Sequence, residues 1–234
     1  MAASKQQTRR KRDPESTRIS ILEAATSILA QDGAEGLSVS SVAKLAGVNR
    51  GTAYQHFQVK EDLVRATLDQ VSHKLLDAVF EGGDLDGDMP EGLPTPDLVH
   101  LPEVIKGMAE FNLRLAEYAI ENPDIGRIWL FDVLSRKNPR DDVFYKRFAQ
   151  ALQNLAESDA SHEDMDVEVL AVVMLTGYFL WPVWVRSHAK TKKARREMAE
   201  RFASEVMRLS MHGVLHADSH SILKAYLKKN ISDS

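Results

Sequence analysis

Side chains able to hydrogen bond with nucleic acid are concentrated in one short segment of the sequence. The polar residues between positions 50 and 57 are Arg50, Gly51, Thr52, Tyr54, Gln55 and His56. If the segment is a helix, only Ala53 and Phe57, one turn apart, and part of the Tyr54 ring can be buried. Guanidinium, hydroxyl, amide and imidazole groups in this pattern suit contacts with DNA phosphates and base edges. The alternative is a solvated surface helix, which is the usual fate of a short polar helix.

A tight turn precedes this segment and would hold it against another helix. The preceding helix is expected to begin after Ser38 and to stop at Gly47, with one apolar face formed by Val39, Val42, Ala43 and Ala46. Glycine accepts the positive φ of a tight turn, and Asn49 can cap the next helix. Two helices joined in this way form a helix-turn-helix. The agreement of turn, charge and flanking helices favours this motif over a solvated helix.

Two longer helices are predicted to flank the motif. Asp13-Pro14-Glu15 has the pattern of a helix start, with a side-chain acceptor at the N-cap and proline at the first helical position. This helix should end at Asp32-Gly33, and its apolar face consists of Ile21, Leu22, Ala25, Ile28 and Leu29. The other helix begins near Lys60, and its apolar stripe consists of Val64, Leu68, Val71, Leu75 and Val79.

Charge is distributed unevenly along the chain. Residues 1 to 60 hold nine Lys or Arg and five Asp or Glu, a net charge of +4, so the remaining residues hold 21 and 29, a net charge of −8. Residues 1 to 12 contain five cations and no acid, and they are predicted to form a disordered basic arm. The N-terminal part of the chain therefore suits an anionic partner.

Composition excludes several classes of protein. The 234 residues are 44% hydrophobic, enough for a packed core, and include no cysteine, so disulfides, a thiol nucleophile and cysteine-bound zinc are excluded. The first residues lack the apolar stretch of a secretory signal. We therefore expect a soluble protein in the cytoplasm.

The N-terminal 65 residues resemble the TetR family of bacterial transcriptional regulators. The resemblance is carried by residues 17–33, by the segment from Ser41 through Phe57 and by Lys60-Glu61-Asp62-Leu63. It implies an all-α fold, with an N-terminal three-helix helix-turn-helix domain and a larger C-terminal helical domain for ligand binding and dimerisation. The DNA-binding residues it implies are Ser38, Ser40, Arg50, Gly51, Thr52, Tyr54, Gln55, His56 and Lys60, the last meeting a phosphate.

Three residues depart from the family pattern. Ser40 stands where many members have arginine, Ala53 where leucine is usual, and Val59 where Ser, Asn or Asp would cap the next helix. The first departure removes a potential DNA contact, and the last weakens a cap by about 1 kcal/mol.

The predicted organisation has five parts. Residues 1–12 form the arm, 13–60 the helix-turn-helix domain, 61–80 a connecting helix, 81–102 a flexible loop rich in Gly and Pro, and 103–234 the C-terminal domain. Within the last part, helical periods cover residues 103–121, 124–136, 141–158, 165–188, 192–216 and 219–229.

The uncharged run from Val169 to Val185 could be a membrane span or a buried helix. Its 17 residues are at the lower limit for crossing a bilayer, and Glu168 and Arg186 bound it closely. A helix that is apolar all round also arises when one face packs on its own subunit and the other on a partner. We therefore expect a homodimer formed through residues 165–188 and 192–216, as the resemblance implies, and no membrane partner.

The resemblance also implies a small-molecule pocket in the C-terminal domain. The candidate ligand-binding residues are Phe111, Asn112, Leu115, Tyr118, Trp129, Phe148, Met174, Tyr178 and Trp181. Thr176 could add another polar group, and Pro182 should kink its helix and open a cavity beside Trp181. If these aromatic side chains instead fill the core, the protein would lack an effector.

Histidines and acids offer weaker alternatives. His212, His216 and His220 are spaced for a metal only if one helix continues through them, and Asp218-Ser219 resembles a new cap. No arrangement of nucleophile, base or paired carboxylates has a catalytic pattern. We expect no catalytic residue, metal or cofactor, and predict a homodimeric repressor released from a palindromic operator by a small apolar ligand. The alternatives are a DNA-binding regulator without an effector and, more distantly, an enzyme fused to a helix-turn-helix.

Overall fold

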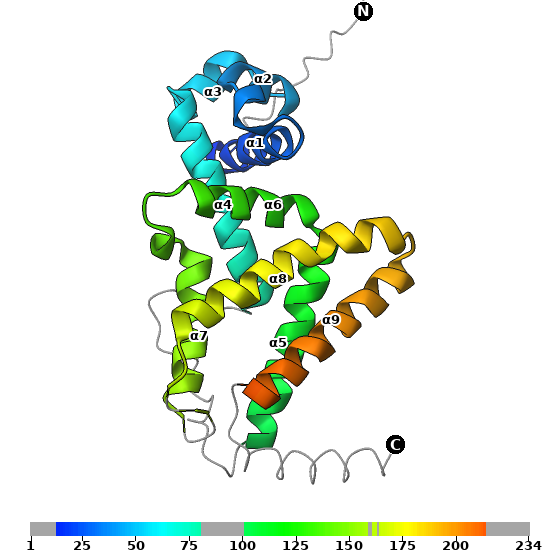
Figure 1. Cartoon of the computed structure of the whole chain (residues 1–234). Helices are drawn as coiled ribbons and strands as arrows, with labels where there is room; N and C mark the ends of the chain where they lie inside the picture. Colours follow the sequence, from blue (N-terminus) through cyan, green and yellow to red (C-terminus); the bar gives the residue numbers. More distant parts are fainter. Residues whose placement is uncertain (1–12, 81–100, 159–160, 163, 214–234) are drawn as a thin grey trace, which may run out of the picture. The chain divides into compact units, whose positions relative to one another are not determined.

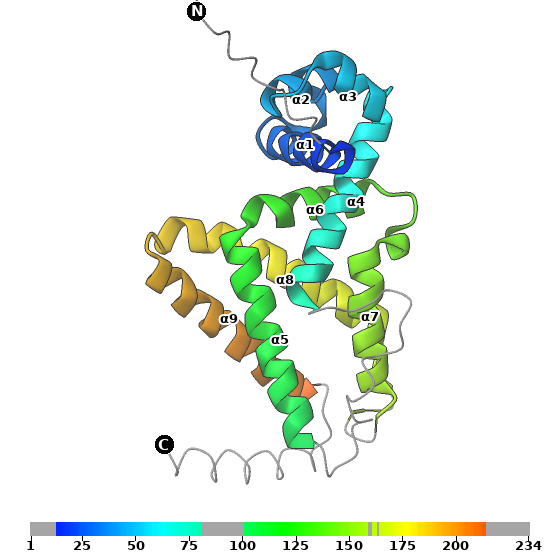
Figure 2. The ribbon, with the colours of Figure 1, turned by 180° about the vertical axis from the view of Figure 1, so that it is seen from behind.

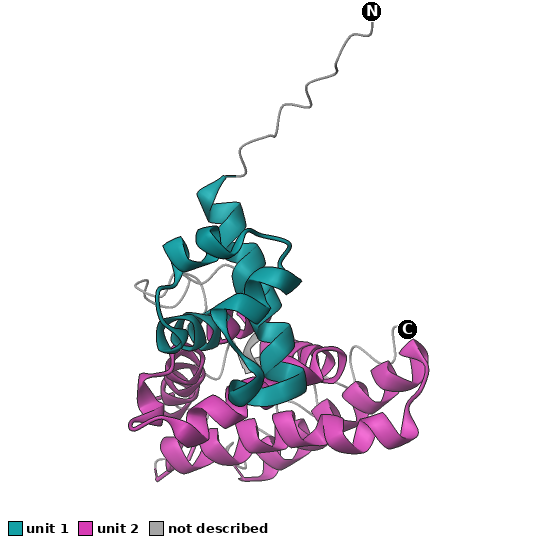
Figure 3. Cartoon of the chain, turned by 90° about the horizontal axis from the view of Figure 1, so that it is seen from above, with its two compact units in different colours: residues 1–70 teal, residues 71–234 magenta. Residues whose placement is uncertain are grey.

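The computed structural model describes residues 13–80, 101–158, 161–162 and 164–213, and these contain helices and no β-strand. The chain divides into two compact units, Met1–Gln70 and Val71–Ser234 (Figure 3). The predicted arm, most of the predicted loop and the predicted last helix lie outside the described residues.

The first unit contains α1 (Pro14–Gly36), α2 (Val39–Leu45), α3 (Arg50–His56) and the first half of α4 (Lys60–Val79). Its core consists mainly of Ile21, Leu22, Ala25, Leu37, Val42, Ala53, Phe57 and Leu63. α4 departs from the predicted stripe in this unit, because Leu63 and Thr67 are buried whereas Val64 and Leu68 are only half-buried. From Val71 onward the predicted residues are buried.

The start of α1 differs from the prediction in its cap. The Asp13 side chain accepts no capping hydrogen bond. Instead its backbone carbonyl accepts from the Ser16 hydroxyl at 2.8 Å and from the Thr17 hydroxyl at 3.1 Å. At the other end, Gly33 adopts φ 68° and interrupts the helix where the Asp32-Gly33 stop was predicted.

The second unit contains the rest of α4 and helices α5 (Leu101–Glu121), α6 (Pro123–Ser135), α7 (Val143–Ala156), α8 (Val167–His188) and α9 (Lys192–Gly213). α5 packs against α6, α8 and α9, and α7 packs against α8 (Figures 1 and 2). α5 begins two residues before its predicted start, within the predicted loop. α7 begins two residues after its predicted start, because Pro139–Asp141 forms a 3-10 turn and Asp142 caps the helix.

α8 has a buried face and an exposed face, although both are apolar. The buried face consists of Ala171, Leu175, Tyr178, Phe179, Pro182 and Val185. The exposed apolar residues, named here the α8 outer face, are Val169, Val172, Val173, Leu180, Val183 and Trp184. The helix is long and apolar enough to cross a membrane, but its buried face belongs to the core of the second unit. A single helix of this kind is weak evidence for a membrane span.

Candidate nucleic-acid interface

The turn between α2 and α3 fixes the direction of both helices. Gly47 adopts φ 64°, which L-residues with a side chain rarely take, and Val48 N–H donates to the Ala43 carbonyl at 3.0 Å. The Asn49 side-chain oxygen accepts from Gly51 N–H at 2.8 Å and so caps α3, as predicted. The predicted helix-turn-helix is therefore confirmed.

α2 begins with a capping box. The Ser38 hydroxyl oxygen accepts from Ser41 N–H, and the Ser41 hydroxyl oxygen accepts from Ser38 N–H, both at 3.0 Å. Ser38 remains exposed in this arrangement. Its side chain therefore already has a structural role, beside the DNA contact that the resemblance implies.

Two buried side chains anchor α3. Ala53 is fully buried and Phe57 is nearly so, as their one-turn spacing predicted. The Arg18 guanidinium of α1 lies 5.5 Å from the centre of the Phe57 ring, a cation–π distance. α3 is consequently held from one side only, which leaves its other side to solvent.

The free side of α3 carries the predicted DNA-binding groups. Arg50, Gly51, Tyr54 and Gln55 are exposed, whereas Thr52 and His56 are half-buried. Lys60, at the start of α4, is also half-buried. These seven residues all lie on α3 or at the first residue of α4.

Ser40 lies near Tyr54, a proximity that the sequence did not reveal. The nearby side chains of the half-buried Ser40 on α2 and of Arg50 lower the pKa of the Tyr54 phenol, Ser40 having the larger effect. The Arg50 guanidinium also lies 5.6 Å from the centre of the Tyr54 ring. Ser40 of α2 therefore lies beside an exposed side chain of α3, Tyr54.

In the second unit, three of the predicted ligand-binding residues belong to a packed aromatic cluster. This aromatic cluster consists of Phe80, Phe111, Trp129, Phe144, Phe148 and Phe179. Each ring lies within 6.4 Å, centre to centre, of at least one other, and Trp129 and Phe179 are 4.8 Å apart. Such spacings are those of a filled core.

Two other predicted ligand-binding residues bond to each other. The buried Tyr178 hydroxyl donates to the Asn112 side-chain oxygen, and the Asn112 amide donates to the Met207 sulfur at 3.0 Å. Burial raises the pKa of Tyr178. These polar groups are therefore satisfied within the protein.

The remaining predicted ligand-binding residues are dispersed. Leu115 is buried, and Tyr118, Met174 and Trp181 are half-buried. The Trp181 indole N–H donates to the Met198 carbonyl at 3.1 Å, and its ring stacks on Phe202. Thr176, the other polar candidate, is exposed on α8. α8 continues through Pro182 as one helix.

Comparisons with known proteins agree with this geometry. A family model described as bacterial regulatory proteins of the tetR family matches residues 21–67, which span α2, α3 and the adjoining parts of α1 and α4. The HTH-type transcriptional regulator YhgD of Bacillus subtilis (strain 168) is 30% identical over 176 residues, covering 74% of this chain and 86% of that protein. The chain belongs to the TetR family. Its helix-turn-helix lies within the residues that the family model matches.

Other relatives match over a shorter stretch of the chain. The HTH-type transcriptional regulator TtgR of Pseudomonas putida is 40% identical over 63 residues, which cover 27% of this chain and 30% of that protein. The chain thus matches less than a third of the length of this relative. The residues that the family model matches are those of the helix-turn-helix and its flanking helices.

Solved structures extend the likeness to the whole fold. A TetR family transcription regulator from Marinobacter aquaeolei VT8 has a TM-score of 0.60 at 20% identity, covering 86% of this chain and 96% of that one. A gamma-butyrolactone receptor has a TM-score of 0.50 at 22% identity, covering 83% and 97%. At these identities the comparison establishes a shared fold: an N-terminal helix-turn-helix domain and a larger helical C-terminal domain.

Proposed function

We propose that this TetR-family regulator is a cytoplasmic, homodimeric repressor that binds a palindromic operator and is released from it by a small molecule. The observation that carries the proposal is the one-sided anchoring of α3. Ala53 and Phe57 hold the helix, and Arg50, Tyr54 and Gln55 project into solvent with groups suited to base edges and phosphates.

The α8 outer face supports the dimer. Six apolar side chains recur on one side of α8 and are between 44% and 63% exposed. A second copy of α8, related by a two-fold axis, would cover them in an isologous interface, with α9 flanking it. The two recognition helices of such a dimer must lie about 34 to 36 Å apart to enter successive major grooves.

An effector releases the protein from DNA only if it binds better to a conformation whose recognition helices are not spaced to enter successive major grooves. One structural neighbour is named as a gamma-butyrolactone receptor, and the fold that it shares with this chain supports a small-molecule effector here. The candidate ligand-binding residues are the nine predicted from the sequence.

The packed aromatic cluster favours a second candidate, a regulator without an effector in this part of the core. A screen of small molecules by thermal denaturation distinguishes the two, because a ligand at 100 times its Kd adds about 2.7 kcal/mol of stability. We expect a compound that raises the Tm and releases DNA. A screen in which stabilising compounds leave DNA binding unchanged supports the second candidate.

DNA recognition is tested by two substitutions on duplexes that the wild-type protein selects from a random pool. Arg50→Ala is expected to cost roughly 1–3 kcal/mol on the selected duplex and to relax its base preference, because a base contact is lost. Lys60→Ala should weaken binding to all duplexes about equally and reduce the salt slope by about 1, because a phosphate contact is lost. Filter binding or fluorescence anisotropy at several salt concentrations measures both effects.

Arg65→Ala is the matched control. Arg65 is an exposed cation of α4 paired with Asp62, and no DNA contact is expected of it. Its removal should leave affinity and base preference unchanged. If Arg50→Ala reduces binding to selected and random duplexes equally, Arg50 contacts the backbone and takes no part in base recognition.

A further inference from the structure

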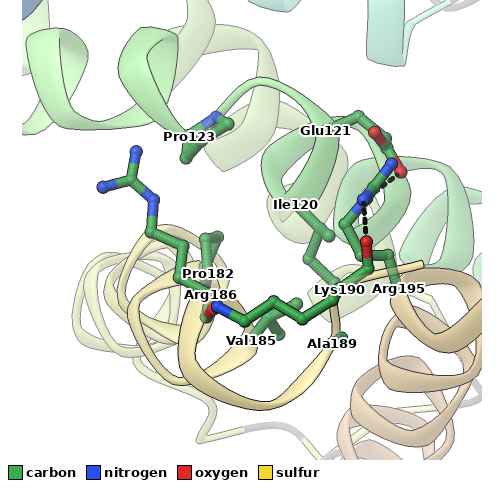
Figure 4. A pocket seen from close by; sticks show the side chains of 9 residues that line it. All are labelled: Ile120, Glu121, Pro123, Pro182, Val185, Arg186, Ala189, Lys190 and Arg195. Atoms are coloured by element: carbon green, nitrogen blue, oxygen red, sulfur yellow. Dashed lines mark hydrogen bonds and ion pairs between the residues drawn. The ribbon is translucent and has the colours of Figure 1, made fainter. Parts of the chain in front are cut away.

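A cleft in the second unit lies where four helix ends meet. It is formed by the end of α5, the start of α6, the end of α8 and the start of α9 (Figure 4). Its volume is about 310 Å³, near the lower limit of small-molecule sites. None of the nine ligand-binding residues predicted from the sequence lines it. It is therefore separate from the aromatic cluster.

The inner wall of the cleft is apolar. It consists of Ile120, Pro123, Pro182, Val185 and Ala189. Val185 and Pro182 belong to the buried face of α8, on the side away from the α8 outer face. Pairing of α8 with a second copy through its outer face would therefore leave these two wall residues uncovered. This wall suits a hydrocarbon chain and offers no aromatic ring to stack on a base.

The rim of the cleft is cationic. Arg186, Lys190 and Arg195 line it together with one acid, Glu121. Arg195 Nε lies 2.8 Å from a Glu121 oxygen, so these two charges compensate each other. Lys190 has no carboxylate partner among the described residues, and its ammonium donates to the Arg186 carbonyl at 2.6 Å.

Arg186 is only partly compensated. It lies 3.3 Å from Asp124, which Arg127 approaches more closely, at 2.9 Å. Among the residues that line the cleft, three cations face one acid. This excess lies in the part of the chain, residues 61–234, whose net charge is −8. A cationic rim around an apolar wall suits an amphipathic anion.

The helix ends do not set the charge of that anion. The C-termini of α5 and α8 and the N-termini of α6 and α9 all meet at the cleft, so their opposite partial charges offset each other. The side chains therefore set the preference, and a single carboxylate can bond with the Lys190 ammonium and the Arg186 guanidinium.

We propose that this cleft binds a small aliphatic monocarboxylate, with its carboxylate on Lys190 and Arg186 and its chain along the wall formed by Val185 and Ala189. The proposal concerns binding alone. It goes beyond the repressor function and does not depend on it, because binding is measured without DNA.

Sodium decanoate is a suitable probe, used on the full chain below its micelle-forming concentration in isothermal titration calorimetry. We expect saturable binding to the wild type and much weaker binding of decanol, which lacks the charge. Lys190→Gln and Arg186→Gln should each raise the Kd about tenfold, as loss of a charge-assisted hydrogen bond predicts, and the double variant should raise it further. Both residues are exposed, so the variants should fold.

Lys193→Gln is the matched control. Lys193 is 88% exposed on α9 and does not line the cleft, so its replacement should leave the Kd unchanged. The proposal is overturned if the wild type does not bind decanoate. It is also overturned if the double variant binds as tightly as the wild type, because the site then lies elsewhere, or if decanol binds equally well.

Discussion

Val173→Glu is expected to convert the dimer into a folded monomer that no longer holds its operator. Val173 is 63% exposed on the α8 outer face, so a carboxylate there remains hydrated in the single protomer and should not disturb folding. In the proposed dimer each copy would bury one such carboxylate in the interface, where it has no cationic partner. This desolvation costs several kcal/mol, enough to prevent association.

The loss of dimerisation should carry over to DNA binding. A monomer reads one half-site, and operator affinity is expected to fall about a thousandfold or more, towards the non-specific level. Sedimentation velocity at micromolar concentration measures the association, circular dichroism the fold and fluorescence anisotropy the operator affinity. Val172→Glu, on the same outer face, should give the same result.

Phe131→Glu is the matched control for these variants. Phe131 is also 63% exposed, but it lies on α6, outside the α8 outer face. This variant should remain dimeric and retain operator affinity. A wild-type protein that sediments as a monomer would contradict the proposed interface, as would a Val173→Glu variant that remains a dimer.

The sequence predicted the recognition motif well because the interactions that form it are local. Asn49 caps α3 through a residue two positions away, and Gly47 supplies its own positive φ. Ala53 and Phe57 are the only fully apolar groups on a short helix, so their burial followed from spacing alone. In each case the partner, or the required conformation, lies within one turn of the chain.

The Asp13 cap shows the limit of such local patterns. The prediction assigned the capping acceptor to the Asp13 side chain, but its backbone carbonyl is the acceptor that is used. Ser16 and Thr17, which follow it, can each donate to that carbonyl. Sequence identifies the residues near a helix end but does not select between competing hydrogen bonds.

α8 shows a second limit. Its composition predicted a helix with apolar residues on every side, but composition could not separate the face that packs on its own subunit from the face left for a partner. Burial in the structure separates them: Leu175 and Phe179 face inward, and Val172 and Val173 face outward. The distinction depends on where α5, α7 and α9 lie, which periodicity does not encode.

Contacts distant in sequence were beyond prediction. The cleft combines residues of four helices separated by up to 75 positions. Another such contact joins Ser72 of α4 to Asp142, 70 residues later. From the sequence alone, an aspartate between a proline-containing turn and a helix start predicts only an N-cap.

Asp142→Ala is expected to destabilise the second unit severely. The Asp142 carboxylate is fully buried and accepts from Ser72 Oγ at 2.5 Å, Trp129 Nε1 at 3.0 Å and Tyr145 N–H at 2.9 Å. Arg136 lies 3.7 Å from it. Truncation removes the carboxylate that accepts hydrogen bonds from α4, α6 and the start of α7. The Trp129 indole N–H and the Ser72 hydroxyl are then buried without an acceptor. The expected loss is about 3–5 kcal/mol of unfolding free energy.

The neighbouring carboxylate provides the control. Asp141 is the preceding residue, but its side chain is exposed and lies 3.9 Å from Lys146, so Asp141→Ala should cost less than about 0.5 kcal/mol. For a chain of this length, the Asp142 variant should lower the Tm by about 6 to 20 °C and the Asp141 variant by only a degree or two. Urea unfolding followed by tryptophan fluorescence measures the difference directly. Equal midpoints for the two variants would show that the buried carboxylate contributes no more than a surface charge, because both substitutions remove the same group and differ only in what surrounds it.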